Sequence, residues 1–330
     1  MVWSVSKGKM FNQCQRKWLY YEIVASATSS DPIRKEAYYL KQVQSIAAWR
    51  GRIVDIVISD KITPFLRTNQ VPKKDQVFSF AENLIERQLE FGKEKRYREN
   101  GVTKSRAGNC FCAFYDIEYN DGLDNNSLES AKHEVKQALF NLLDSNFIQR
   151  IANENEYLIS QRSLRFKLLD EHNITCTPDM IVFFEDQPPL IIDWKVHTFG
   201  NSDAWLQLGI YSLALSRAKP HKDFPESFMS YADRPDSFGL LEYQLLKNIQ
   251  RNYSLKKEDV LDIEDHIFRS SSQMNLITKG KKFEDLDFSV FKTTRRPQVC
   301  GRCQFKKLCW DKESDSRLKP MQQTLFGVFK

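Results

Sequence analysis

The chain has 330 residues, of which 41% are hydrophobic and 28% are charged, the composition of a globular protein that needs no disulfide scaffold. It contains neither a signal-peptide pattern nor a run approaching the roughly 20 apolar residues that span a bilayer. We therefore expect a cytoplasmic protein, nucleoid-associated if bacterial, and the formal net charge of +6 is compatible with a nucleic-acid partner.

The spacing of apolar residues predicts helices in the first part of the chain. Up to residue 150, apolar residues recur at mixed steps of three and four, which indicates an N-terminal segment, 1–30, followed by a mainly helical region, 31–150. Residues 91–109 are basic and interrupted by glycine. This stretch predicts a loop, which is either solvated or in contact with phosphates.

From about residue 155 the pattern is that of strands. Residues 156–169 alternate like a strand, and residues 177–196 contain two apolar runs separated by a polar turn with two prolines, which predicts a hairpin. Residues 202–218 then have the pattern of a helix. We predict an α/β core over residues 151–299.

The predicted hairpin gathers three charged residues on one face. Asp193 and Lys195 are two apart on one strand, so their side chains point to the same side of the sheet. If the turn covers residues 185–189, Asp179 lies opposite Lys195 and diagonal to Asp193, about 7–8 Å away at Cα. All three side chains then share that face.

The two carboxylates of the hairpin indicate a site for a divalent cation. At this separation they repel each other unless a cation lies between them, and Mg²⁺ prefers such oxygen ligands. A bound ion stabilises charge on a phosphodiester and lowers the pKa of a bound water, which Lys195 orients or helps to deprotonate. The alternative is a surface hairpin with an ordinary Asp–Lys pair.

Gln207 and Tyr211 extend this constellation. They are four apart on the helix that follows, so they share a face. With Pro178–Asp179 and Asp193–Lys195, they resemble the PD-(D/E)xK nuclease superfamily. The resemblance implies a restriction-endonuclease-like core, a central mixed sheet flanked by helices. It also implies that Asp179, Asp193 and the backbone carbonyl of Trp194 bind Mg²⁺ or Mn²⁺, and that Gln207 and Tyr211 contact DNA and support the active site.

Asp55 occupies a position at which this family usually has a histidine ligand. The family pattern is Gly, two residues, an apolar residue and His, and the matching residues here are Gly51–Asp55. A carboxylate binds Mg²⁺ at least as well as imidazole does, so we expect Asp55 to be a metal ligand. The alternatives are a charge on the helix surface and a weakened or inactive site.

Three cysteines near the C-terminus, Cys300, Cys303 and Cys309, have the spacing Cys-x2-Cys-x5-Cys. Three thiolates do not complete a four-ligand site, and Cys14 is weakly favoured as the fourth. On the residues alone, zinc and an iron–sulfur cluster both remain possible centres. The other cysteines are Cys110, Cys112 and Cys176, the last of which is expected to be a buried thiol.

The order of these motifs resembles the RecB-like iron–sulfur nucleases, a group that includes AddB, exonuclease V and the CRISPR-associated iron–sulfur nucleases. In that group an early lone cysteine precedes the nuclease core, and a Cys-x2-Cys-x5-Cys follows it, as over residues 1–310 here. The resemblance implies a [4Fe–4S] cluster bound by Cys14, Cys300, Cys303 and Cys309, with an iron–sulfur loop at 300–312. We expect a structural role for this cluster, because it ties both ends of the chain together.

Residues 313–330 are predicted to form a flexible tail. Within it, Gln322, Leu325 and Phe326 resemble the clamp-binding peptide of replication proteins, which implies a sliding clamp as partner. The alternative is a tail that covers apolar surface of its own domain.

The motifs favour a metal-dependent DNA nuclease that hydrolyses phosphodiester bonds, on single-stranded DNA or at DNA ends. The alternative is a nuclease-like fold that has lost activity through Asp55 and serves as a DNA-binding subunit. No membrane partner is expected.

Overall fold

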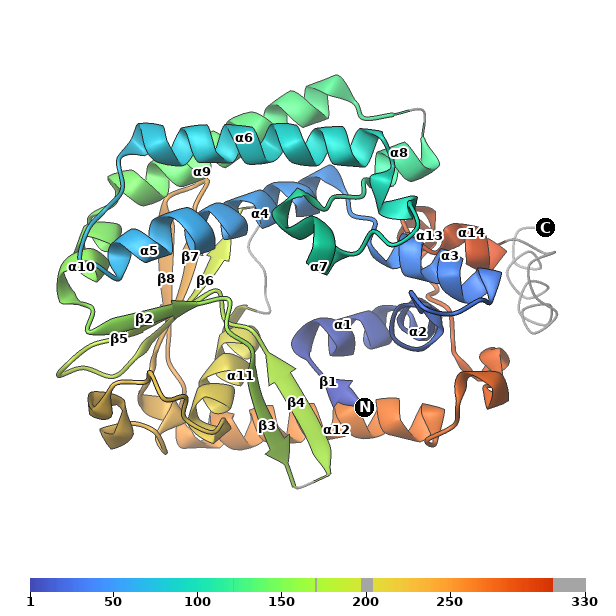
Figure 1. The fold of residues 1–330 in the computed structure, drawn as a ribbon. Coiled ribbons are helices and arrows are strands. Elements are labelled where there is room, and N and C mark those ends of the chain that lie inside the picture. Colours follow the sequence, from blue (N-terminus) through green and yellow to red (C-terminus); the bar gives the residue numbers. More distant parts are fainter. Residues whose placement is uncertain (121, 170, 197–203, 311–330) are drawn as a thin grey trace.

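The computed structural model describes residues 1–120, 122–169, 171–196 and 204–310. Within these ranges the chain forms two β-sheets (Figure 1). The larger sheet is mixed and is flanked by helices, and the second sheet is smaller. The predicted α/β class is confirmed, and the first 150 residues are mainly helical, as expected.

Residues 313–330 lie outside the described part of the chain, so the clamp-binding peptide with Gln322, Leu325 and Phe326 stays a prediction. Of the helices that the structure describes, none combines the length and apolarity needed to cross a bilayer.

The described strands, in chain order, are β1 (Val2–Trp3), β2 (Tyr157–Ser160), β3 (Leu164–Leu168), β4 (His172–Cys176), β5 (Met180–Phe183), β6 (Leu190–Lys195), β7 (Gly239–Gln244) and β8 (Ile249–Tyr253). The larger sheet has the order β2-β5-β6-β7-β8, with β6 and β7 parallel and the other neighbours antiparallel. The smaller sheet has the order β1-β4-β3. Residues 156–169, predicted as one strand, form two strands in different sheets, because Gln161 adopts a left-handed φ of 51° between them.

The α-helices of the described residues are α1 (Val5–Gln13), α2 (Gln15–Leu19), α3 (Pro32–Lys41), α4 (Ile46–Val57), α5 (Thr63–Leu66), α6 (Lys74–Lys93), α7 (Lys104–Ala107), α8 (Tyr115–Tyr119), α9 (Asn125–Asp144), α10 (Asn146–Glu154), α11 (Ala204–Arg217), α12 (Lys257–Thr278), α13 (Pro297–Gly301) and α14 (Lys306–Trp310). The loop predicted at 91–109 is wrong in part, since it contains the end of α6, the helix α7 and two short 3₁₀ turns. Burial of Tyr97 and the capping of α7 by Thr103 explain this local order.

Two layers of helices cover the larger sheet (Figure 1). Helices α4, α6 and α9 pack together on the face that presents Met180 and Ile192. Helix α11 covers the opposite face, which presents Ile181 and Ile191, and α12 packs against α11 and strand β4 of the smaller sheet. Because both faces are buried, the central strands are nearly continuous runs of apolar residues rather than alternating ones.

The register of the hairpin differs from the predicted one by two residues. Met180 pairs with Ile192 and Val182 with Leu190, so Asp179 is level with Asp193 and not with Lys195. The turn is longer than predicted: Phe183 pairs only with Tyr157 of β2 and Phe184 is buried in the core, so neither continues the ladder with β6. A shift of two residues preserves the side to which each residue points, so the charged residues still share one face.

Helix α4 positions Asp55. Ser45 caps its N-terminus by accepting a hydrogen bond from the backbone N–H of Ala48. Trp49 and Ile53 are fully buried against the neighbouring helices. These contacts hold the C-terminal turn of α4 near the C-terminal end of strand β6, where Asp193 lies, and the charges of Asp55 and Asp193 interact there.

The N-terminal segment packs on the smaller sheet and α12, and α2 lies near α13 and α14 (Figure 1). Strand β1 pairs with β4, and α1 packs against α12. The Tyr20 hydroxyl donates to the carbonyl of Leu308 at 3.1 Å, and the Tyr115 hydroxyl donates to the carbonyl of Gly301 at 2.7 Å. The C-terminal cysteine segment is therefore held by residues from the N-terminal helical part of the chain.

Two glycines test the packing of the helical layer. A Cβ on Gly92 would lie 2.6 Å from the ring of buried Phe114, whereas a Cβ on Gly51 would meet nothing within 4 Å. We expect Gly92→Ala to lower the free energy of unfolding by about 1–2 kcal/mol, because overpacking outweighs the gain in helix propensity. Gly51→Ala should raise it by up to about 1 kcal/mol. Thermal denaturation followed by circular dichroism measures both changes; a Gly92→Ala protein as stable as wild type would contradict rigid packing around Phe114.

Candidate active site and cysteine cluster

Asp179 is held at the start of β5 by two hydrogen bonds. The backbone N–H of Trp194 donates to its Oδ2 at 2.9 Å, and the side chain of Gln161 donates to its Oδ1 at 3.0 Å. The backbone N–H of Gln161 also donates to the carbonyl of Asp179 at 3.1 Å. The carboxylate is thus fixed directly beside the central strand β6.

Asp193 is the most buried acid of the hairpin, with 1% of its surface exposed. It forms an ion pair with Lys195, two residues further along the same strand. The side-chain amide of Gln207 donates to its Oδ1 at 2.9 Å, and Gln207 also lies 2.7 Å from the Tyr211 hydroxyl. Helix α11 therefore brings both of its predicted residues against the hairpin.

The three acids share one electrostatic environment. Burial raises the pKa of Asp55 to about 7, the charge of Asp193 adds to this, and Lys195 opposes it. Burial together with Asp193 and Asp55 raises the pKa of Asp179 well above its ordinary value, and burial also raises the pKa of Asp193. Burial would lower the pKa of Lys195, but the Asp193 carboxylate outweighs it and the pKa is raised. The site thus contains one positive lysine and three acids, and each ionised acid makes ionisation of the other two less favourable.

Metal-binding geometry is absent from the described side chains as they stand: no three Asp, Glu, His or Cys residues in those ranges are placed to hold one metal ion. The carboxylates of Asp179 and Asp193 are instead turned to the protein donors of Trp194, Gln161, Gln207 and Lys195. The donor set itself, carboxylates and a backbone carbonyl on one side of a strand end, is the kind that a hard divalent cation prefers.

Glu242 is an acid of this region that the sequence analysis missed. It is fully buried on β7, directly beside Asp193 in the parallel register, and its charge raises the pKa of Asp193 in addition to burial. The hydroxyl of Tyr253 and the amide of Gln244 donate to it at 2.8 and 3.0 Å. The sequence signal for Glu242 was a single Glu within an otherwise apolar strand. Gln161, which contacts Asp179, was also missed, because that contact depends on a turn that the sequence pattern does not indicate.

The four cysteines predicted to act together line one small cavity. Two short hydrogen-bonded turns present them: Cys14 Sγ accepts from the N–H of Lys17, and Cys303 Sγ accepts from the N–H of Phe305, both at 3.4 Å. Burial raises the pKa of Cys309 to about 12, and the neighbouring thiols contribute to this. The polar and sulfur-bearing residues of the lining are Cys14, Arg16, Lys17, Tyr20, Thr293, Thr294, Cys300, Cys303, Lys306 and Cys309.

The remaining cysteines lie elsewhere. Cys176 is buried as expected, and burial raises its pKa to about 12. Cys112 is also buried, whereas Cys110 is partly exposed near Arg87. Neither is part of the lining of the cavity that holds the other four.

An ion network anchors the cysteine segment to the helical region. Buried Glu118 on α8 accepts from Lys307 at 2.9 Å, from Arg98 at 2.7 Å and from the Tyr97 hydroxyl at 2.7 Å. Burial would raise the pKa of Glu118, but these donors, Arg98 first, lower it to about 2. The carboxylate stays ionised and holds α14 against α8.

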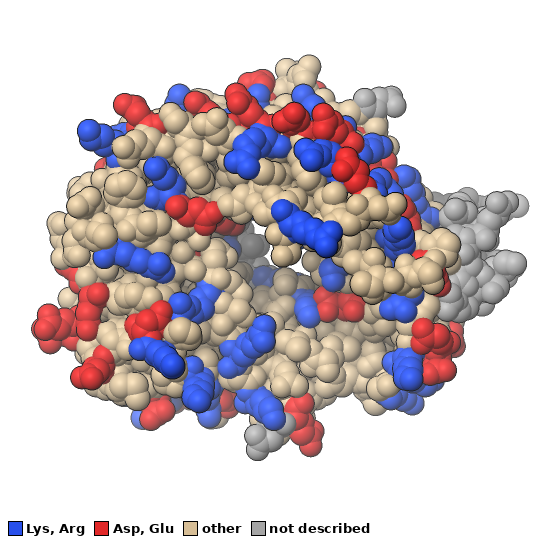
Figure 2. All heavy atoms as spheres, viewed as in Figure 1, with Lys and Arg blue, Asp and Glu red and all other residues tan. Residues whose placement is uncertain are grey.

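A group of cations lies on helices α3, α4 and α7. Burial lowers the pKa of Lys104, and the positive charges of Arg52 and Lys41 lower it further. Burial also lowers the pKa of Lys41. Figure 2 shows that this face of the molecule is hollowed near its centre, with Lys and Arg as well as Asp and Glu side chains around the hollow. Cations held close together repel one another, so this group favours an anionic partner.

Comparison with models of known protein families identifies a family for this chain. The family model for the PD-(D/E)XK nuclease superfamily matches residues 2–310, nearly the whole chain. A comparison with curated proteins finds no match.

The raised pKa of Asp55 predicts how stability depends on pH in metal-free buffer. Because folding raises this pKa from 3.8 to about 7, the unfolded chain releases the proton at lower pH than the folded protein does. The folded protein should therefore lose stability as the pH rises from about 4 to about 8. Asp55→Asn removes this loss and should raise the free energy of unfolding at pH 8 by up to about 4 kcal/mol, less where solvent reaches the side chain.

Urea denaturation of wild type and Asp55→Asn at the two pH values checks this expectation. Asp262→Asn, at an exposed position of α12, is the control and should change stability equally little at both. An Asp55→Asn effect of the same size at both pH values would show that this carboxyl group does not titrate as described.

Proposed function

The chain belongs to the PD-(D/E)XK nuclease superfamily, and we propose that it is a metal-dependent deoxyribonuclease that acts on single-stranded DNA or at DNA ends. Members of this superfamily generally hydrolyse phosphodiester bonds with Mg²⁺ or Mn²⁺. The observation that carries the proposal is the gathering of Asp179, Asp193 and Lys195 on one face, with Asp55 close enough to interact with them.

The residues of the candidate active site have separate roles in the proposed reaction. Asp55, Asp179, Asp193 and the carbonyl of Trp194 would hold the divalent ion, which supplies an activated water and stabilises charge on the phosphodiester. Lys195, protonated beside Asp193, would orient the water or neutralise charge that develops on the phosphate. All these groups lie within one water-poor region, where each electrostatic interaction is strong.

Helix α11 supports the same site. The Gln207 amide holds Asp193 in one orientation and contacts the Tyr211 hydroxyl. Burial raises the pKa of Tyr211, and the charge of Asp193 adds to it, so the hydroxyl keeps its proton and can donate to a phosphate oxygen. Both residues therefore position the acid, and either could also contact the DNA backbone.

The cations of α3, α4 and α7 are consistent with a polyanionic substrate. Arg52 lies on the same helix as Asp55, and Lys41 and Lys104 are near it. A phosphate backbone would relieve the repulsion among these three groups and release bound counterions.

A [4Fe–4S] cluster is the second cofactor of the proposal. The four cysteines from both ends of the chain line one cavity, and Arg16, Lys17 and Lys306 in its lining provide positive charge beside an anionic cluster. Four thiolates are also the ligand set of a structural zinc ion, and the resemblance in motif order favours iron and sulfide. When bound, such a cluster would tie residue 14 to residue 300 and so stabilise the closed chain.

A catalytically inactive DNA-binding subunit is the second candidate function. The observation that favours it is Asp55 in the place of the usual histidine, because a carboxyl group whose pKa is about 7 is partly protonated at neutral pH and is then a poor ligand. A nuclease assay separates the two functions.

Asp193→Asn is the decisive variant for that assay. Labelled single-stranded and double-stranded DNA are incubated with Mg²⁺ or Mn²⁺, and we expect wild type to cleave and Asp193→Asn to be at least about 100-fold slower. Asp186→Asn, at an exposed position of the same hairpin, is the matched control and should cleave like wild type. Equal cleavage by wild type and Asp193→Asn would indicate a contaminant, and binding without cleavage by wild type would favour the inactive subunit.

Cys303→Ala tests the cluster. Closing a loop between the chain ends is worth about 5 kcal/mol, so this variant of the protein should melt at a clearly lower temperature and lose iron, sulfide and brown absorbance. Cys110→Ala, outside the cavity, should retain all three properties. If Cys303→Ala has the melting curve and iron content of wild type, the cluster assignment is wrong; zinc in place of iron and sulfide would equally reject it.

A further inference from the structure

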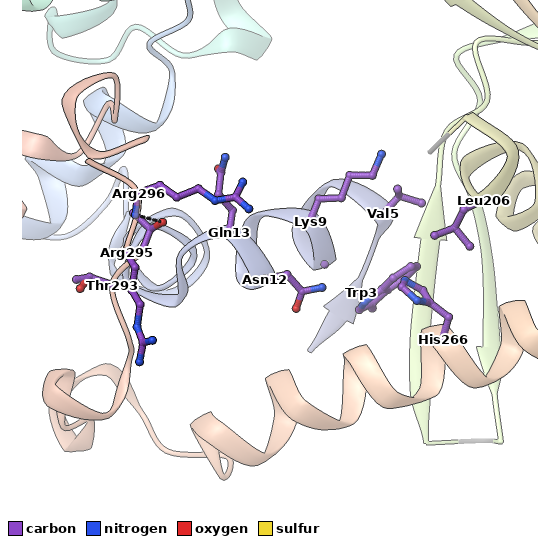
Figure 3. A pocket seen from close by; sticks show the side chains of 12 residues that line it. Trp3, Val5, Lys9, Asn12, Gln13, Leu206, His266, Thr293, Arg295 and Arg296 are labelled. Carbon is purple, nitrogen blue, oxygen red and sulfur yellow. Dashed lines mark hydrogen bonds between the residues drawn. The ribbon is translucent and has the colours of Figure 1, made fainter. Parts of the chain in front are cut away.

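A cavity of about 630 Å³ lies between α1, the first turn of α11, α12 and the segment before α13 (Figure 3). Its volume falls within the range of roughly 300–1,000 Å³ that is typical of ligand sites. The described residues that line it are Trp3, Val5, Gly8, Lys9, Asn12, Gln13, Leu206, His266, Thr293, Thr294, Arg295 and Arg296.

The charges in this lining have one sign. Lys9, Arg295 and Arg296 are exposed cations, and no Asp or Glu is among the described residues of the lining. Asn12 and Gln13 add amide groups that can hydrogen-bond to phosphate or sugar oxygens. The cavity is therefore suited to an anion.

The two ends of the cavity differ in chemistry. Figure 3 shows Arg295 and Arg296 at one end and Trp3, Leu206 and His266 at the other, with Lys9 and Asn12 between them. Trp3 is fixed there, because its Nε1 donates to the hydroxyl of Ser270 at 3.0 Å. A cationic end joined to an apolar and aromatic end matches a nucleotide unit, which has a charged phosphate and a flat base.

The cavity adjoins both sites already described. Leu206 directly precedes Gln207, and the positive charge of Lys9 opposes burial in its effect on the pKa of Asp193. At the other end, the carbonyl of Arg296 accepts hydrogen bonds from the backbone N–H groups of Val299 and Cys300, at 3.0 and 3.4 Å. A strand whose scissile phosphate lies at Asp193 could therefore continue into the cavity toward the cysteine segment.

We propose that this cavity binds the single-stranded part of the nucleic acid next to the cleaved phosphate, with Arg295 and Arg296 on phosphates and a base against Leu206 and His266. The inference rests on the proposed nuclease function and assigns one cavity to the single-stranded part of its substrate. A duplex keeps its bases stacked inside, whereas a single strand can place a base in an apolar recess. Single-stranded substrate thus gains contacts here that a duplex cannot make.

The double variant Arg295→Ala/Arg296→Ala tests the phosphate end. In metal-free buffer, fluorescence anisotropy with a labelled oligothymidine should show at least about tenfold weaker binding than wild type. The slope of log affinity against log salt should fall by about 0.7 for each lost phosphate contact, about 1.4 for two. Lys281→Ala/Lys282→Ala removes the same charge from exposed positions outside the cavity and should change neither quantity.

His266→Ala tests the base end. It should weaken oligothymidine binding by about fivefold or more and leave the salt slope unchanged, because no phosphate contact is lost. Blunt duplex DNA should bind wild type and His266→Ala with equal affinity. If the arginine pair and the lysine pair weaken binding equally, or if duplex affinity falls as much as single-strand affinity, the inference is wrong.

The outcome also separates this inference from the proposed function. If wild type cleaves DNA and Arg295→Ala/Arg296→Ala binds oligothymidine like wild type, the proposed role of the cavity is wrong and the proposed nuclease function is supported. If wild type does not cleave DNA but Arg295→Ala/Arg296→Ala binds oligothymidine more weakly than wild type, the nuclease function is wrong and the role of the cavity is supported.

Discussion

Burial of the Asp193 carboxylate inside an apolar sheet is the constraint on which the candidate active site depends. Removing a carboxylate from water is costly, and the ion pair with Lys195 and the amide of Gln207 offset that cost only in part. Asp55 and Asp179 lie in the same region, where burial and repulsion between the acids raise the pKa of both. The apolar strands and the helices on both faces hold the acids in place against this repulsion.

Closure of the chain ends is the second structural theme. The N-terminal strand and α1 pack on the smaller sheet and α12, while α13 and α14 are held by Tyr20, Tyr115 and the Glu118 network. These contacts bring Cys14 to the cavity that the C-terminal cysteines line. Packing and hydrogen bonds between distant segments therefore help to position the cysteine segment.

The two themes meet at α1. Lys9 lies midway along this helix and its charge reaches Asp193, and Cys14 directly follows the C-terminal end of the helix. The cavity beside this helix consequently lies between the acids and the cysteines, with the cations of Arg295 and Arg296 at its far end. The proposed substrate cavity and the contacts that close the chain ends thus share the same short segment.

The sequence by itself determined the parts whose chemistry is local. Because side chains alternate along a strand, Asp193 and Lys195 point to the same face of the sheet. Because a helix has 3.6 residues per turn, Gln207 and Tyr211 lie on one helix face. The spacing of the three C-terminal cysteines defines a shared site. Only the tertiary structure decided the register of the hairpin and the proximity of Asp55 to Asp193. It also decided that Gln161 contacts Asp179 and that Glu242 lies beside Asp193. These depend on burial and on pairing between distant segments, which local patterns do not encode: the burial of Phe184 lengthened the turn, and packing of α4 on its neighbours placed Asp55.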